Sequence, residues 1–220
     1  MKIKAILTGA TGMVGEGVLH ECLHHPAIEE VLVLGRKSCG ITHPKLKEIV
    51  HSNLYDLSSI EDHLKGYNAC FFCLGTTSLG KKEPEYCKIT YELTMHVATT
   101  LSKLNSELVF CYISGAGTDS TEKGKLMWAR VKGKTENDLM KLPFKKVYNF
   151  RPGIIKPTKG LKNTLGFYKY LGWLIPIIQL LSSSAVSTLK ELGIAMINAA
   201  DKGYEKQILE VKEIVALAKK

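Results

Sequence analysis

Residues 7–15 read Leu7-Thr8-Gly9-Ala10-Thr11-Gly12-Met13-Val14-Gly15, and this stretch decides how the N-terminal part of the chain folds. The apolar residues before it, 3–7, predict a short buried strand, and those after it recur at helical spacing to residue 23. The glycines Gly9, Gly12 and Gly15 therefore lie on a strand-to-helix turn. Glycine permits the tight turn and lets the backbone approach a pyrophosphate closely. We expect a dinucleotide-binding turn; the alternative is an ordinary turn between a strand and a helix.

A second apolar strand, residues 30–34, is followed at once by Gly35, Arg36 and Lys37. In dinucleotide-binding folds an acidic residue at this place binds the ribose hydroxyls of NAD, whereas arginine accommodates the 2′-phosphate of NADP. The chain has no acid here, and hydrogen bonds to a charged partner contribute about 1.5–3 kcal/mol each. The sequence therefore favours NADP(H) over NAD(H), with Arg36 and Lys37 as the selecting residues. An ordinary basic loop is the alternative.

Strands and helices alternate along the chain. We expect strands at 3–7, 30–34, 46–50, 69–74, 108–113, 146–150 and 208–211, and long helices at 84–104, 125–141 and 188–200. This alternation predicts an α/β fold in which a doubly wound, mostly parallel sheet lies between two helix layers. We expect one domain, residues 1–220, with a cofactor half at about 1–115. Substrate-side elements and a small C-terminal helical cap are expected at about 152–220.

The composition of the chain is that of a globular protein, with 45% hydrophobic and 23% charged residues. Its formal charge of +9 comes from lysines with few aromatic residues between them, which indicates a solvated basic surface and not a nucleic-acid site. The six cysteines follow no disulfide spacing. Cys70 and Cys73 are formally a C-x-x-C pair, but their apolar flanks and the lack of a second ligand pair indicate buried strand thiols and not a metal or redox site. We therefore expect reduced thiols, no metal site, no secretory signal and a cytoplasmic location.

Residues 161–181 form a strongly apolar and aromatic stretch. Lys162, Lys169 and Pro176 interrupt it and argue against a transmembrane span. Three interpretations stay open: a helix docked on the core, a cap over a substrate cleft, or a face that binds a protein partner or a second copy of the chain. A role at a membrane surface is the least favoured.

Five stretches together resemble the atypical short-chain dehydrogenases/reductases, and most of all their Tat-interacting oxidoreductase-like and bacterial nucleoside-diphosphate-sugar epimerase-like members. The stretches are residues 8–15, 73–77, 113–117, 131–136 and 150–153. The resemblance implies a Rossmann sheet with NAD(P)(H) bound across its strand C-termini and a small-molecule substrate beside the C-terminal elements. The residues implied to bind the cofactor are Gly9, Thr11, Gly12, Met13, Val14 and Gly15 at the pyrophosphate, Arg36 at the adenosine ribose, Asp56 and Leu57 at the adenine, and Leu74, Gly75 and Thr76 at the inner ribose.

One departure from the family's pattern concerns catalysis. Members with the full catalytic set carry Tyr-x-x-x-Lys on the helix after the fifth strand, and this chain reads Trp128-Ala129-Arg130-Val131-Lys132. Residues 128 and 132 face the same way on a helix, so Lys132 retains the implied contact with the nicotinamide ribose. Trp128 does not replace the tyrosine, because an indole N–H has no useful acidity. Ser114 is the implied oxyanion-binding serine, with Thr118 or Ser120 as alternatives.

Two classes of function remain. In the first, the chain is an oxidoreductase or epimerase-like enzyme with an unidentified substrate and another proton donor. Tyr86, Tyr91, His96 and ordered water are the candidates for that donor. In the second class, the chain binds NADP(H) without turnover, as a regulatory or interaction module.

Overall fold

A computed structural model describes residues 2–163 and 185–220 of the chain. Their main feature is a seven-stranded sheet in the order β3-β2-β1-β4-β5-β6-β9, with every pair of neighbours parallel. The strands are β1 (Ile3–Thr8), β2 (Ile28–Gly35), β3 (Leu46–Val50), β4 (Ala69–Phe72), β5 (Val109–Ile113), β6 (Lys146–Arg151) and β9 (Ile208–Glu210). Its first six strands have the order of doubly wound dinucleotide-binding sheets, which confirms the expected α/β fold.

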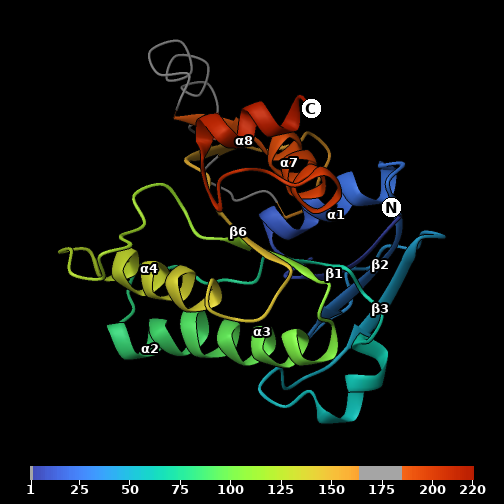
Figure 1. Ribbon diagram of the computed structural model, residues 1–220, viewed down its shortest axis with the longest axis horizontal. Helices are drawn as coiled ribbons and strands as arrows, with labels where there is room; N and C mark the ends of the chain where they lie inside the picture. The colour runs from blue at the N-terminus through green and yellow to red at the C-terminus, as the bar shows by residue number, and fades with distance from the viewer. Residues whose placement is uncertain (1, 164–184) are drawn as a thin grey trace.

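Helices cover both faces of the sheet (Figure 1). One layer holds α1 (Met13–His24), α7 (Leu189–Lys202) and α8 (Val211–Ala218). The other holds α2 (Glu83–Cys87), the π-helical turn η2 (Lys88–Glu92), α3 (Leu93–Leu104) and α4 (Met127–Leu139), while the 3₁₀ helix η1 (Ser58–Leu64) joins β3 to β4. Side chains alternate along the central strand β1, so that Leu7 enters the core under α1 and α7 and Ile6 the core under α3.

Glycines let α1 approach α7 closely. A Cβ atom on Gly17 would lie 2.2 Å from the side chain of Leu189, and one on Gly193 would lie 2.8 Å from the side chain of Glu21. Both distances are shorter than a carbon–carbon contact allows, so larger residues at these positions would separate the helices. The close packing fixes α1, whose N-terminus borders the site described below.

Two features were not expected from the sequence. The predicted helix 84–104 is interrupted by η2, where the N–H of Leu93 donates to the carbonyl of Lys88. The short strands β7 (Ile154–Lys156) and β8 (Val186–Thr188) form a separate parallel pair.

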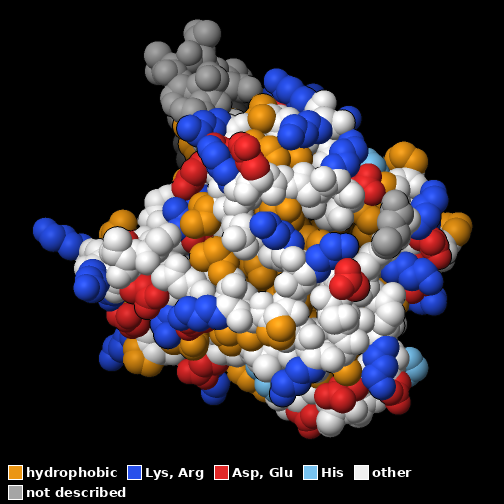
Figure 2. Space-filling view, in the orientation of Figure 1, with side chains coloured by type: hydrophobic (Ala, Val, Ile, Leu, Met, Phe, Trp, Pro, Cys, Tyr) orange, Lys and Arg blue, Asp and Glu red, His pale blue; other side chains and the backbone are white. Residues whose placement is uncertain are grey.

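The predicted apolar segment 161–181 lies, from residue 164 onward, outside the described residues. At its start, Leu161 packs against the core, and the backbone N–H groups of Lys162 and Asn163 donate to the Glu16 carboxylate of α1 at 2.8 and 2.7 Å. None of the helices in the described ranges is long and apolar enough to cross a membrane. On the face seen in Figure 2, lysine and arginine side chains are scattered among acidic and apolar ones and form no single patch.

Candidate functional site

The glycine turn between β1 and α1 is built on close backbone contacts. Gly9 has φ +76°, and a Cβ atom there would lie 2.7 Å from the backbone of Cys73 at the end of β4. A Cβ atom on Gly15 would lie 2.1 Å from the carbonyl oxygen of Gly9. Gly12 differs, because the nearest atom to its Cβ position is that same oxygen at 3.5 Å, an ordinary contact. Gly9 and Gly15 therefore hold the turn together, and Gly12 leaves space in front of the helix.

The N-terminus of α1 lacks a side-chain cap. Gly12 is the N-cap residue, and no side chain there accepts from the first-turn N–H groups of Met13, Val14 and Gly15. Such uncapped N–H groups and the helix dipole favour an anion. Glu16, the acidic residue of this turn, is buried and accepts two backbone N–H bonds, so its charge is already compensated. The helix start is therefore suited to a phosphate group.

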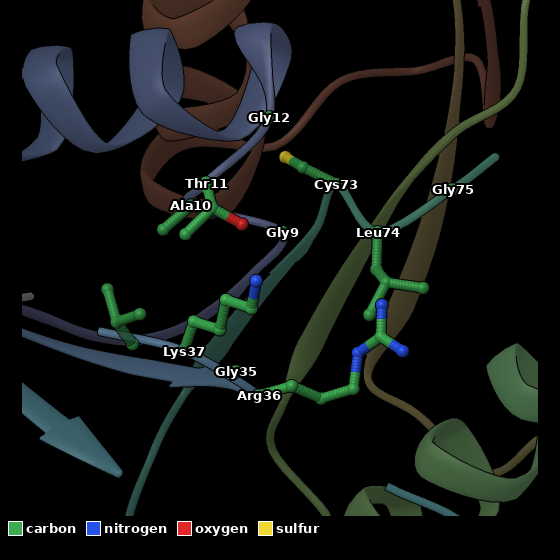
Figure 3. A pocket seen from close by; sticks show the side chains of 11 residues that line it. Gly9, Ala10, Thr11, Gly12, Gly35, Arg36, Lys37, Cys73, Leu74 and Gly75 are labelled. Atoms are coloured by element: carbon green, nitrogen blue, oxygen red, sulfur yellow. The ribbon is translucent and has the colours of Figure 1, made fainter. Parts of the chain in front are cut away.

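A cavity of about 610 Å³ lies at the C-terminal ends of β1, β2 and β4 (Figure 3). It is lined by Gly9, Ala10, Thr11, Gly12, Val33, Gly35, Arg36, Lys37, Cys73, Leu74 and Gly75. The Lys37 side chain extends toward the glycine turn, and that of Arg36 toward Leu74 (Figure 3). Both cations are exposed, and neither forms an ion pair within the described ranges. The volume is within the range of cofactor sites.

A smaller cavity of about 230 Å³ shares Arg36, Leu74 and Gly75 with the first one. Its other lining residues are Ser52, Asn53, Leu54, Tyr55, Thr76, Ile89 and Leu93. Tyr55 donates a hydrogen bond of 2.6 Å to the carbonyl of Lys88, which ties this cavity's wall to the π-helical turn. The two cavities form adjoining compartments at the same edge of the sheet.

The expected cofactor residues are only partly brought together. Gly9, Thr11, Gly12, Arg36, Lys37, Leu74 and Gly75 line the larger cavity, and Thr76 lines the smaller one. Asp56 and Leu57 line neither cavity. Leu57 is buried in the core, and the Asp56 carboxylate accepts from the N–H and hydroxyl of Ser58. Their side chains thus take part in a turn and in the core, whereas residues 52–55 line the smaller cavity.

A second cluster lies where β5 and β6 end. The Lys132 ammonium group on α4 donates to the backbone carbonyl of Ser114, and burial lowers the pKa of Lys132 to about 8 against the opposing field of Glu136. The Ser114 hydroxyl donates to Glu136 at 2.5 Å and to the carbonyl of Phe150 at 3.1 Å. Arg151 donates twice to the same Glu136 carboxylate, at 3.0 and 2.5 Å. Ser114 and Lys132 are therefore adjacent, as expected.

The hydroxyl groups of this cluster already have internal partners. Thr118 donates to the carbonyl of Gly115 at 2.7 Å, and Ser120 accepts from Arg151 at 2.6 Å. Trp128 packs beside Gly117, whose Cβ position is 3.5 Å from the indole ring, and the Cβ position of Gly115 is 4.0 Å from the Lys132 nitrogen. Trp128 and Lys132 therefore reach the same turn, residues 115–117.

The three side chains considered as proton donors lie elsewhere. Tyr86 is buried at 2% exposure, and burial raises the pKa of its hydroxyl. Tyr91 donates to Asp138 at 2.8 Å. The His96 ring lies 6.4 Å from the ring of Tyr55, near the smaller cavity. None of the described contacts brings these groups to Lys132.

Glu136 and Arg151 are the functional candidates that sequence reasoning missed. Both stand in stretches that carry the family resemblance, but no role was inferred for either. A signal was present in the spacing of Lys132 and Glu136, because residues four apart share one face of a helix. The partner Arg151 comes from a strand fifteen residues later, and no local pattern joins it to Glu136.

Metal binding and the state of the cysteines can be read from the same structure. Across residues 2–163 and 185–220, no three His, Cys, Asp or Glu side chains converge as a metal site. The six cysteines are free, and burial raises the pKa of Cys22, Cys70 and Cys111 well above the usual value. These three thiols are packed in the apolar core.

Several known proteins match this chain over most of its length. Protein FMP52-1, mitochondrial, of Scheffersomyces stipitis is 27% identical over 99% of this chain and 100% of its own length. Protein HTATIP2 of Rattus norvegicus is 24% identical over 68% of this chain and 61% of its own. The crystal structure of Helicobacter pylori ADP-L-glycero-D-manno-heptose-6-epimerase superposes with a TM-score of 0.68 at 14% identity, covering 99% of this chain and 81% of that one. At that identity the superposition shows a common fold.

The names of these relatives correct one expectation. Matching proteins of Scheffersomyces stipitis, Aspergillus oryzae and Candida albicans are all named mitochondrial. The cytoplasmic location expected from the free cysteines was therefore wrong, because reduced thiols do not separate one reducing compartment from another.

Family membership follows from the sequence match. Residues 5–124, more than half of the chain, match the model of the NAD dependent epimerase/dehydratase family. This match includes the glycine turn and the loops that line both cavities. It supports a nicotinamide dinucleotide as the cofactor and confirms the resemblance to atypical short-chain dehydrogenases/reductases. The chain belongs to the NAD-dependent epimerase/dehydratase family.

Proposed function

We propose that the chain binds NADP(H) in preference to NAD(H) and is an oxidoreductase or epimerase-like protein whose helix α4 carries Trp128 in place of the family's tyrosine. The observation that carries the cofactor preference is the exposed pair Arg36 and Lys37. Both residues line the larger cavity, and no acidic side chain of the described residues lines it with them. A phosphate there would meet two cations that form no ion pair with any residue the structure describes.

The residues fit a dinucleotide laid along the sheet edge. The first turn of α1, beginning at Gly12, would hold the pyrophosphate, and Arg36 with Lys37 would hold the 2′-phosphate. The smaller cavity would take the adenine, stacked among apolar side chains such as Leu93. Lys132 of α4, whose ammonium group reaches Ser114 at the end of β5, would hold the nicotinamide ribose.

The bound cofactor supplies hydride transfer, and the chain binds and orients the reactants. Few of its side chains are free to transfer a proton to a substrate, because the hydroxyls of Ser114 and Thr118 already donate to groups within the protein. This observation favours the second candidate function, an NADP(H)-binding module without turnover. A panel of carbonyl and quinone substrates separates the two: NADPH oxidation by the native protein supports the enzyme. Tight NADPH binding with turnover only in Trp128→Tyr supports the binding module.

The cofactor preference is tested by calorimetric titration of NADPH and NADH into the native protein and into Arg36→Asp. Loss of a charge-assisted bond and gain of repulsion should weaken NADPH binding about 10- to 100-fold and leave NADH binding similar or stronger. Lys103→Asp is the matched control, because it makes the same charge change ten residues, about 15 Å, along α3 from Leu93. An NADPH/NADH affinity ratio that is equal in Arg36→Asp and native protein would refute the assignment.

A further inference from the structure

Glu136 is a buried carboxylate that has three donors. It is fully buried, and it accepts from the Ser114 hydroxyl and from the Nε and Nη2 atoms of Arg151. Arg151 donates further to Ser120 at 2.6 Å and to Glu210 at 3.2 Å. One carboxylate therefore joins α4 to the ends of β5 and β6. Removing a charge from such a set exposes the remaining charges to one another.

Lys132 lies one helical turn before Glu136 on α4 but is not hydrogen-bonded to it. Among the described residues, its ammonium group donates to the carbonyl of Ser114, which carries no charge. Burial lowers the pKa of Lys132 to about 8, and the field of Glu136 opposes this change. Without that field, the amine would lose its proton at a lower pH.

Other ionisable groups face this cluster from the neighbouring strands. They are Tyr112 on β5, Arg151 on β6 and Glu210 at the end of β9. Tyr112 is neutral at physiological pH, because burial raises the pKa of its hydroxyl far above neutral. Arg151 stays charged, and it is bonded to both carboxylates, so Glu136 is the group whose charge acts on Lys132.

We propose that Glu136 is a positioning residue that keeps Lys132 charged and directed at the end of β5, and so sets the upper pH limit of tight binding of the cofactor's nicotinamide half. This inference rests on the proposed binding of NADP(H). Arg151 has the opposite effect on Lys132, because it holds the Glu136 carboxylate away from direct pairing with the Lys132 ammonium group. Substitutions of the two partners should therefore move the pH limit in opposite directions.

The test is the NADPH dissociation constant between pH 7 and 9.5, with 2′,5′-ADP as a probe that carries the phosphates but lacks the nicotinamide ribose. In the native protein NADPH binding should weaken about five- to tenfold as the pH rises through about 8, because charged hydrogen bonds are roughly twice as strong as neutral ones. In Glu136→Gln the pH at which half of this loss of NADPH affinity has occurred, the midpoint, should be lower than in the native protein. In Arg151→Gln it should rise, because the freed carboxylate can pair with Lys132. The dissociation constant of 2′,5′-ADP should show neither of these midpoint shifts.

A third variant keeps the test decisive if the other two fold poorly. Lys132→Arg carries a charge throughout this pH range, so its NADPH profile should be flat. A native-like fall in Lys132→Arg, equal midpoints in native and Glu136→Gln, or shifts of both partner variants in the same direction would overturn the inference. Failure of native protein to bind either NADPH or 2′,5′-ADP would instead overturn the proposed function.

Discussion

Replacement of Gly12 by valine should separate cofactor binding from folding. The Cβ position of Gly12 has one neighbour within 4 Å, the carbonyl oxygen of Gly9 at 3.5 Å. The backbone there has φ −103° and ψ 163°, an extended conformation that valine adopts readily. The new methyl groups would instead occupy the space in front of the first turn of α1. The protein should fold, and the phosphate should lose its place.

The expected magnitudes differ for the two properties. Glycine is a fair N-cap residue and valine a poor one, so the free energy of unfolding should fall by about 1 kcal/mol. In a chain of this size that lowers Tm by roughly 2–4 °C. Loss of two charge-assisted bonds between backbone N–H groups and phosphate removes at least about 3 kcal/mol of binding free energy, or roughly 150-fold in affinity.

Calorimetry with NADPH and thermal unfolding measure both quantities on the same preparations. Gly15→Ala is the informative control, since its Cβ atom would lie 2.1 Å from the Gly9 carbonyl oxygen, where backbone cannot easily yield. That variant should lose more stability than Gly12→Val, about 1–3 kcal/mol. NADPH affinity within threefold of native in folded Gly12→Val would refute the placement of the pyrophosphate.

Three further predictions concern stability. Thr188→Val removes the side-chain cap of α7, where the Thr188 hydroxyl accepts from the N–H of Glu191 and the Glu191 carboxylate accepts from the N–H of Thr188. This change should lower the unfolding free energy by about 1 kcal/mol, as measured by urea titration. An unchanged urea midpoint would contradict the prediction. Gly17→Ala should cost about 1–3 kcal/mol, and a double-mutant cycle with Leu189→Ala should recover part of that loss if the two residues are in contact. Partial burial raises the pKa of Asp138, but bonds from neighbouring donors outweigh it and hold the pKa at about 2. The charged form therefore stabilises the fold above about pH 4, and this stabilisation is lost toward pH 2. Asp138→Asn should lower the unfolding free energy by about 1 kcal/mol at pH 6 and by less as the pH falls. A loss of unfolding free energy that is the same at every pH would exclude the charge as its source.

Elements defined by local patterns were predictable from the sequence. The strand 46–50 has the predicted bounds in the structure, and α1 follows the glycine turn as expected. The π-helical turn was not predictable, because such turns are rare and α-helix continues on both sides of this one, at α2 and α3. β7 and β8 were missed for another reason. Each has three residues, and they pair across about thirty residues of chain, so neither carries a local signal of its own.

The candidate site divides in the same way. The glycine turn depends on glycines that are close together in the sequence, so its residues could be named in advance. Asp56 and Leu57 were expected at the adenine through family resemblance alone, and the structure uses their side chains for a turn and for the core. The pair of Glu136 and Arg151 joins a helix to a strand, and each residue alone looks like an ordinary surface charge.

The glycine turn and the cluster around Glu136 are built from different parts of the chain, and this bears on how activity could be lost while cofactor binding persists. The glycine turn is held by close contacts of Gly9 and Gly15 with backbone atoms, so its shape is set by the chain itself. At the ends of β5 and β6, the Ser114 hydroxyl and the Arg151 guanidinium group are both hydrogen-bonded to Glu136. Trp128, which we propose stands in place of the family's tyrosine, and the other residues of this cluster lie apart from the glycine turn. Under the proposed function, a substitution in this cluster should therefore change the chemistry and the pH dependence of NADPH binding, while the glycine turn keeps its hold on the pyrophosphate.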